Sequence, residues 1–194
     1  ANFSPLNNYS SYAKAWKKSV DYEGEFEDLQ LLSNKLYFLE KSELNEYILN
    51  SFDINKLISY YAIIFSISSS DCITKNFYIY HDPITNKWHI FPWDNDTSFG
   101  NDWHGVYNNQ LVRWIGNDTM DYQQLFQRLL DNDSNYLQFH NKLNEIITTG
   151  FIQISQEIDS IYSVIKNDVY LDTNKVCSND LFDKEITVLK NYLV

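Results

Sequence analysis

Four polar residues between positions 71 and 96 are the strongest candidates for chemistry in this sequence. They are Asp71, Asn76, Asp94 and Asp96. Carboxylate and amide oxygens are the ligands that hard divalent cations such as Mg²⁺ prefer. A carboxylate can also accept or orient the proton of a hydroxyl group. These residue types therefore predict a site that combines a metal ion with a proton acceptor.

The order of these residues along the chain is more informative than their spacing. Four residues separate Asp71 from Asn76, as in the kinase catalytic loop, where the Asp orients a hydroxyl and the Asn holds a metal. Asp96 and Asn101 repeat this spacing by chance. However, the first pair follows a buried helix and precedes a β-hairpin, and Asp94 stands directly after that hairpin. Because a hairpin returns the chain to its starting end, we expect Asn76 and Asp94 to lie side by side.

A hairpin and several helices are predicted to position these residues. Residues 77–80 and 88–91 are β-prone runs separated by turn formers. Asp53 is predicted to cap a helix that continues to Phe65 and is apolar on most sides, which indicates a central position. The fold class is therefore α+β and mostly α-helical. Apolar spacing predicts further helices at 12–19, 26–39, 42–50 (with Ser42 as N-cap), 122–130, 136–149, 152–166 and 180–193.

Composition indicates one compact domain over residues 1–194 and restricts its partners. The formal net charge of −11 argues against a nucleic-acid partner, because phosphates need neutralising Lys and Arg side chains. An acidic protein that binds ATP usually needs a divalent cation between itself and the phosphates. Cys72 and Cys177 are interpreted as two lone buried thiols, and no apolar run is long enough to span a membrane.

Several of these residues also have simpler interpretations. Asp94 and Asp96 are equally typical of a turn or a helix cap. The favoured role of Trp93 and Trp103 is core packing rather than stacking on a ligand. Arg113 is interpreted as a solvated charge. The four histidines lack the spacing of a zinc site, and we expect surface or hairpin roles for them: His81, His89, His104 and His140.

The segment around Asp94 resembles the signature of a known family. Residues 88–100 read Trp-His-Ile-Phe-Pro-Trp-Asp-Asn-Asp-Thr-Ser-Phe-Gly, which is similar to the signature of the CotH family, the spore-coat protein H kinases. The lead-in at 76–83 and the helical segment from 125 to Tyr136 are also similar to that family. The resemblance covers roughly residues 40–170, and its Pro-Trp-Asp-x-Asp segment is specific.

The resemblance implies an atypical protein-kinase fold and phosphorylation of Ser or Thr with ATP and Mg²⁺ or Mn²⁺. Carried over by position, Asp71 matches the catalytic Asp and Asn76 the metal-binding Asn. Asp94 matches the second metal-binding Asp, and Asp96 is a further ligand or a brace for the loop. The implied partner is a Ser-rich coat or surface protein, and the implied location is the spore coat or another extracytoplasmic surface.

The chain also departs from the kinase pattern. Ser69 and Ser70 stand where ordinary kinases have His-Arg, and neither a Gly-x-Gly loop nor a strand with an ATP-contacting Lys precedes Asp71. We therefore expect residues 1–194 to be a kinase-like C-terminal lobe, inactive alone, with the N-terminal nucleotide lobe outside this chain. A natural pseudokinase without that lobe is the less favoured alternative. Two other functions stay open: a non-catalytic coat or adhesion protein, and a carbohydrate-binding module with a structural Ca²⁺ at Asp94 and Asp96.

Overall fold

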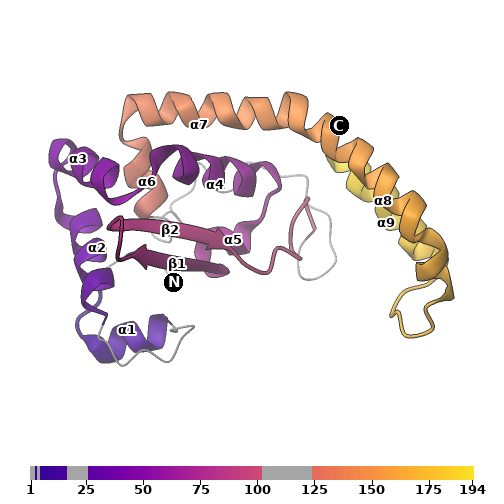
Figure 1. Cartoon of the computed structure of the whole chain (residues 1–194), viewed down its shortest axis with the longest axis horizontal. Helices are drawn as coiled ribbons and strands as arrows, with labels where there is room; N and C mark the ends of the chain where they lie inside the picture. The colour runs from indigo at the N-terminus through magenta and orange to yellow at the C-terminus, as the bar shows by residue number, and fades with distance from the viewer. Residues whose placement is uncertain (1–2, 4, 17–25, 102–123) are drawn as a thin grey trace.

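Helices make up most of the structure, and one two-stranded antiparallel sheet lies among them (Figure 1). A computed structural model describes residues 3, 5–16, 26–101 and 124–194 of the chain. Within these ranges the α+β, mostly helical class and the predicted hairpin are confirmed. The elements are α1 (Tyr9–Ala15), α2 (Glu27–Phe38), α3 (Lys41–Ser51), α4 (Ile54–Ser66), α5 (Ser70–Thr74), β1 (Phe77–Asp82), β2 (Lys87–Pro92), α6 (Gln124–Leu130), α7 (Asp133–Glu145), the π-helical turn η2 (Ile146–Gly150), α8 (Phe151–Leu171) and α9 (Asn179–Tyr192).

Helix α4 lies at the centre of the body, as its apolar sequence predicts. Its N-cap is Asp53, whose Oδ1 accepts a hydrogen bond from the Lys56 amide at 3.3 Å. Buried side chains occur on several sides of the helix, and the Tyr61 ring lies 4.7 Å from that of Phe126 on α6. The burial of these apolar side chains stabilises the packing of α4 against both the sheet and α7.

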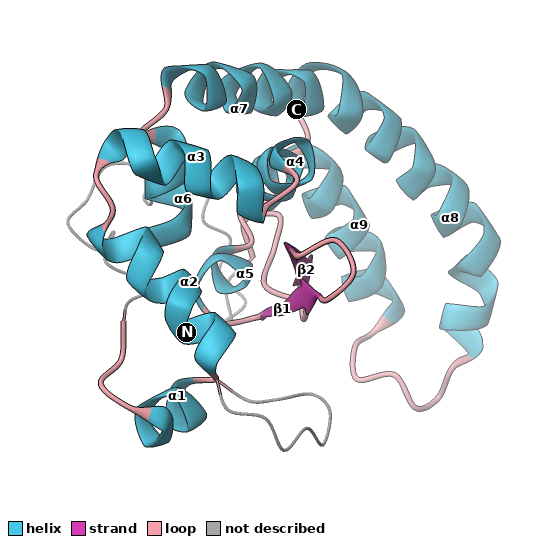
Figure 2. Cartoon of the chain, turned by 60° about the vertical axis from the view of Figure 1, so that its left-hand side comes forward, coloured by secondary structure: helices cyan, strands magenta, loops and turns pink. Residues whose placement is uncertain are grey.

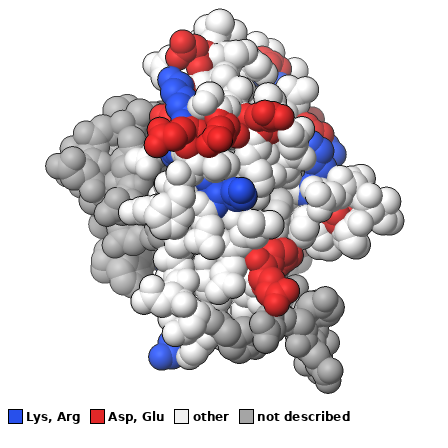
Figure 3. Space-filling model, turned by 90° about the vertical axis from the view of Figure 1, so that its left-hand side faces the viewer, with Lys and Arg blue, Asp and Glu red and all other residues white. Residues whose placement is uncertain are grey.

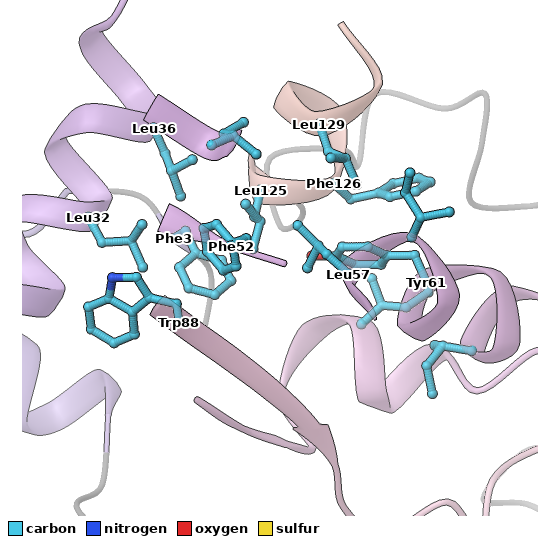
Figure 4. Packing of buried hydrophobic residues seen from close by; sticks show 14 of the residues in the cluster. Phe3, Leu32, Leu36, Phe52, Leu57, Tyr61, Trp88, Leu125, Phe126 and Leu129 are labelled. Carbon is cyan, nitrogen blue, oxygen red and sulfur yellow. The ribbon is translucent and has the colours of Figure 1, made fainter. Parts of the chain in front are cut away.

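Helices α2 and α6 close the other side of the core, where Leu32 and Leu36 face Leu125 and Leu129 (Figure 4). Arg128 fastens the two helices together. Its Nε donates to the carbonyl of Leu36 at 3.0 Å, and a terminal nitrogen donates to that of Leu39. The last carbonyls of a helix lack partners within the helix, so Arg128 satisfies groups that would otherwise be unpaired.

The hairpin pairs Phe77 with Pro92 at its open end and Asp82 with Lys87 at its turn. At the turn, Asn86 has a φ of 55° and Asp82 accepts a hydrogen bond from the Ile84 amide at 2.9 Å. Hydrogen bonds from Thr85 and from this amide lower the pKa of the Asp82 carboxyl. The turn chemistry thereby fixes the register, which in turn fixes the positions of the residues that flank the two strands.

Helices α8 and α9 form an arm that runs away from the body (Figure 1), and they lie side by side in Figure 2 as well. Helix α7 passes into α8 through the π-helical turn η2, where the long helix bends. Phe151 is the one buried side chain on α8, and α9 has none. Apolar side chains such as Val164 (74% exposed) and Leu171 (79% exposed) therefore face solvent on the arm.

The predicted N-cap at Ser42 is wrong. Helix α3 begins at Lys41 after Glu40, so Ser42 lies inside the first turn rather than at the cap. The extended backbone of Glu40, and not a side-chain cap, sets the start of α3.

Acidic groups form several clusters on the face shown in Figure 3, with single basic groups between them. No helix among the described residues has both the length and the apolar character needed to cross a membrane.

Candidate functional site

Asp71 lies in the short helix α5 and not in a loop, which corrects the prediction. The chain leaves α4 through Ser68, whose φ of 53° is in the left-handed region. Ser69 then donates its amide hydrogen bond back to Ile64 at 3.0 Å, and α5 starts at once. A buried contact also holds α5, because the Tyr60 hydroxyl donates to the carbonyl of Cys72 at 2.7 Å.

Asp71 and Asn76 are joined through the backbone. The carbonyl of Asp71 accepts hydrogen bonds from the amides of Lys75 and Asn76, both at 2.8 Å. The Asp71 carboxylate pairs with the Lys75 ammonium at 3.0 Å, and the Asp71 side chain stays 27% exposed. The end of α5 thus sets the path of the chain from Asp71 to the start of β1.

The hairpin brings Asn76 and Asp94 together, as predicted. The amide of Trp93 donates to the carbonyl of Asn76 at 3.0 Å. The side-chain nitrogen of Asn76 lies 3.4 Å from the carbonyl oxygen of Asp94 and 3.5 Å from its Oδ2. Asp94 has a φ of 57°, a left-handed conformation that is uncommon for a residue with a side chain and is concentrated at functional sites.

Asp96 lies in a turn of its own just beyond Asp94. Its Oδ1 accepts a hydrogen bond from the amide of Thr97 at 2.9 Å. The turn is tied to the body where Phe99, with a φ of 54°, donates its amide hydrogen bond to Ile67 at 2.5 Å. Both expected roles of Asp96, as a brace of the loop and as a metal ligand, stay predictions.

The donor groups fit a magnesium ion that is shared with phosphates. Within the described ranges, no three carboxylate, imidazole or thiol side chains gather closely enough to enclose a metal. Asp94 supplies one carboxylate, and Asn76 supplies an amide whose oxygen can replace its nitrogen by rotation about the side chain. Mg²⁺ is commonly held by one or two carboxylates together with phosphate oxygens and water, so two neighbouring donors are sufficient.

Trp93 is exposed to solvent, so the prediction of core packing is wrong for this residue. It is 58% exposed, and its ring lies 5.5 Å from that of Tyr78, which is also exposed. Tyr78 lies within β1, and Trp93 follows the end of β2 and directly precedes Asp94 in the sequence. By contrast, Trp103, His104 and Arg113 lie outside the described residues. The fold also lacks, where it is described, the second sheet that a β-sandwich carbohydrate-binding module would need.

A buried polar cluster behind Asp94 was not predicted. Asn95 Oδ1 accepts hydrogen bonds from the hydroxyl of Ser69 and the thiol of Cys72, both at 2.8 Å. The sequence gives no signal of this contact, because a single Asn in a polar loop is typical of a turn.

Both cysteines are free thiols, as predicted. Cys72 is buried, but Cys177 is only half-buried, which corrects that part of the prediction.

The two histidines of the hairpin contact neighbouring side chains. His81 lies with its Nδ1 3.1 Å from Asp28 Oδ2 and its Nε2 3.0 Å from Asn86 Oδ1. Its ring stacks on Trp88 at 4.3 Å. His89 stacks between Tyr80 and Phe91, with ring centroids 6.2 and 6.3 Å away. Both residues thus have the hairpin roles that we expected.

Comparison with known proteins agrees with the resemblance in the sequence. A family described as "CotH kinase protein" matches residues 3–194. The chain is also 25% identical, over its whole length, to the inner spore coat protein H of Bacillus subtilis (strain 168), and the match covers 54% of that relative. The chain therefore spans about half the length of the curated relative that it matches.

Proposed function

Since this chain belongs to the CotH kinase protein family, we propose that it forms the metal- and phosphate-holding part of an ATP-dependent protein kinase. The proposal depends mainly on the contact between Asn76 and Asp94 at the open end of the hairpin. The side-chain nitrogen of Asn76 lies 3.5 Å from Oδ2 of Asp94. Asp71 lies in α5, five positions before Asn76, and its carbonyl accepts a hydrogen bond from the Asn76 amide. Two loops that meet in this way support a fold related to the C-terminal lobe of kinases.

The proposed roles follow from the chemistry of each side chain. Asn76 and Asp94 would hold Mg²⁺ or Mn²⁺, which offsets the negative charge of the ATP phosphates when it is bound. Asp71 would accept or orient the proton of the attacking Ser or Thr hydroxyl. Lys75, which pairs with Asp71 at 3.0 Å, would hold that carboxylate in one orientation. Asp96 would brace the loop that carries Asp94.

The exposed ring of Trp93 supports a place for the nucleotide base beside this metal site. An aromatic ring that remains 58% exposed next to a candidate phosphate site can stack on a flat base. The proposal needs further nucleotide contacts, which we assign to an N-terminal lobe of the same polypeptide. Residues 1–194 alone are then expected to transfer little phosphate.

A transfer assay tests this function. The natural polypeptide that carries this sequence would be incubated with γ-labelled ATP, Mg²⁺ or Mn²⁺ and a Ser-rich protein. We expect transfer in the wild type and a loss of roughly 10²-fold or more in Asp71→Asn and Asp94→Ala. Asp168→Ala, at an exposed position of α8, is the matched control. Absence of transfer from a folded wild type with either metal would contradict the kinase proposal.

A second function, assembly in a coat, is favoured by two observations. The relative from B. subtilis is named as an inner spore coat protein. In addition, the α8–α9 arm exposes apolar side chains such as Val164 and Leu171. The spore coat is accordingly the proposed location, with a Ser-rich coat or surface protein as the proposed partner. The transfer assay separates the two functions, since a scaffold would retain no activity that depends on Asp94.

A further inference from the structure

Asn95 lies between two exposed acidic residues, yet its side chain points into the protein. Its Oδ1 accepts hydrogen bonds from Ser69 Oγ and Cys72 Sγ, both at 2.8 Å. Ser69 and Cys72 are 0% exposed. Neither Asp94 nor Asp96 makes a comparable contact with buried groups of the described structure. Asn95 is thus the residue through which the side chains of this loop are hydrogen-bonded to buried groups.

The two donors belong to the segment that carries Asp71. Ser69 directly precedes α5 and Cys72 lies within it, so Asp71 stands between them in the sequence. The Cys72 thiol also lies 3.2 Å from the carbonyl of Trp93. The single proton of this thiol therefore has two acceptors within reach on the loop after β2, the nearer being Asn95 Oδ1 at 2.8 Å.

Asn95 Oδ1 is the acceptor of the Ser69 hydroxyl and the nearer of the two acceptors of the Cys72 thiol. A buried hydroxyl without an acceptor is unfavourable, so the structure favours the conformation in which Asn95 turns inward. With Asn95 fixed, the preceding residue is held at a φ of 57°, and its carboxylate lies beside Asn76. A residue in this uncommon conformation persists only where its surroundings determine it.

We propose that Asn95 is a positioning residue for the metal site. The cluster of Ser69, Cys72 and Asn95, which we call the Asn95 cluster, fixes the Asp94 carboxylate relative to both Asn76 and Asp71. This inference rests on the proposed function, because it assumes that Asn76 and Asp94 bind a metal. It adds that metal affinity depends on an acceptor oxygen that does not itself touch the metal.

Three variants separate the oxygen from the shape of the side chain. Asn95→Leu keeps a similar size and removes the acceptor, whereas Asn95→Asp restores an acceptor oxygen at the same position. The double variant Ser69→Ala with Cys72→Ala removes the two donors and leaves Asn95 in place. Asp94→Asn changes the proposed metal ligand itself. It therefore tests whether the metal binds at Asp94, and not whether Asn95 positions that residue.

The measurement is Mn²⁺ binding to the purified chain, followed by the electron paramagnetic resonance signal of unbound Mn²⁺. Asn95→Leu and the double variant are each expected to weaken binding by roughly 10- to 100-fold, the range seen when outer-shell partners of metal ligands are removed. Asn95→Asp is expected to bind close to the wild type. Combining Asn95→Leu with the double variant should cause no further loss, since both break the same contacts.

The outcomes distinguish this inference from the proposed function. The proposed metal site is incorrect if the wild type binds no Mn²⁺, or if Asp94→Asn binds Mn²⁺ as tightly as the wild type. In either case the positioning role of Asn95 is incorrect as well. If Asp94→Asn weakens binding but Asn95→Leu does not, only the positioning role is overturned. Equal weakening in Asn95→Leu and Asn95→Asp would also overturn it. If Asn95→Leu does not fold, as judged by circular dichroism, the double variant decides by the same comparison.

Discussion

The side-chain nitrogen of Asn76 lies 3.5 Å from Oδ2 of Asp94, although 18 positions separate the two residues in the sequence. The hairpin accounts for this, because Phe77 pairs with Pro92, which places Asn76 opposite Trp93 and within reach of Asp94, the next residue. Trp93 and Asn76 also share a backbone hydrogen bond of 3.0 Å. The register of the sheet is therefore part of the candidate site, because it determines which residues after β2 lie beside Asn76.

The first prediction concerns Asn76 as a metal ligand. Asn76→Ala should raise the Mg²⁺ concentration needed for half-maximal phosphate transfer by about tenfold or more, because one oxygen donor is lost. Asn167→Ala, at an exposed position of α8, should leave this concentration unchanged. A magnesium titration of the transfer rate measures both. Equal magnesium dependence in the two variants would mean that Asn76 does not bind the metal.

The second prediction concerns Trp93. Stacking of a base on an aromatic side chain contributes about 1–3 kcal/mol, so Trp93→Ala should raise the KM for ATP by roughly 5- to 150-fold. Trp93→Phe should retain most of the affinity. Because the ring is 58% exposed, the free energy of unfolding should change by less than about 0.5 kcal/mol. Tyr80→Ala, on the same hairpin, is the control, and an equal effect on KM there would argue against a stacking site at Trp93.

Local sequence signals predicted the elements that depend on local interactions. The cap at Asp53 and the apolar character of α4 arise within one helix, and both are observed. The turn of the hairpin depends on Asp82 and Asn86, which are turn formers in most contexts. From the hairpin alone it follows that Asn76 and Asp94 are neighbours. This part of the candidate site was therefore within reach of the sequence.

The remaining features depend on contacts between distant segments. Helix α5 has only five residues, too few to show a helical period, and its carbonyl at Cys72 is held by the Tyr60 hydroxyl. Asn95 meets Ser69 across 26 positions of sequence. Trp93 was assigned to the core because large aromatic residues are usually buried there, whereas the alternation of the hairpin places it outside.

The third prediction concerns Tyr60, which supports α5. Its hydroxyl donates to the carbonyl of Cys72 at 2.7 Å, so Tyr60→Phe would leave that carbonyl without this partner. We expect a loss of about 1 kcal/mol in the free energy of unfolding, measured by urea denaturation. Tyr37→Phe changes an exposed ring and should have little effect. No difference between the two variants would show that the buried hydrogen bond contributes nothing measurable.

The same residue predicts a dependence on alkaline pH. Burial raises the pKa of Tyr60 above its ordinary value of 10.0. Above pH 10 the unfolded chain therefore releases this proton while the folded protein keeps it, so the free energy of unfolding falls as the pH rises. The fall should be shallower in Tyr60→Phe, which has no such proton. Urea denaturation at pH 9 and pH 11 measures the difference, and parallel behaviour of the two proteins would contradict the assignment.

The last prediction concerns Asp183, which joins the two helices of the arm. Its carboxylate accepts hydrogen bonds from the hydroxyls of Tyr162 at 2.7 Å and Tyr170 at 2.5 Å. These bonds lower the pKa of the Asp183 carboxyl. Their stabilisation is therefore present at neutral pH and is lost as the pH falls below 3.8, the ordinary value, and through the lowered pKa.

Because so few side chains of α8 and α9 are buried, this cluster should dominate the local stability of the arm. Asp183→Ala is expected to speed amide hydrogen exchange in α9 at pH 7 and to leave exchange in α4 unchanged, as measured by mass spectrometry. Asp168→Ala, an exposed carboxylate on the same arm, should change neither. If exchange in α9 were equal in both variants, the apolar contacts of Phe151 and Phe182 would have to hold the arm instead. If exchange in α4 rose as well, the arm and the body would unfold as one unit.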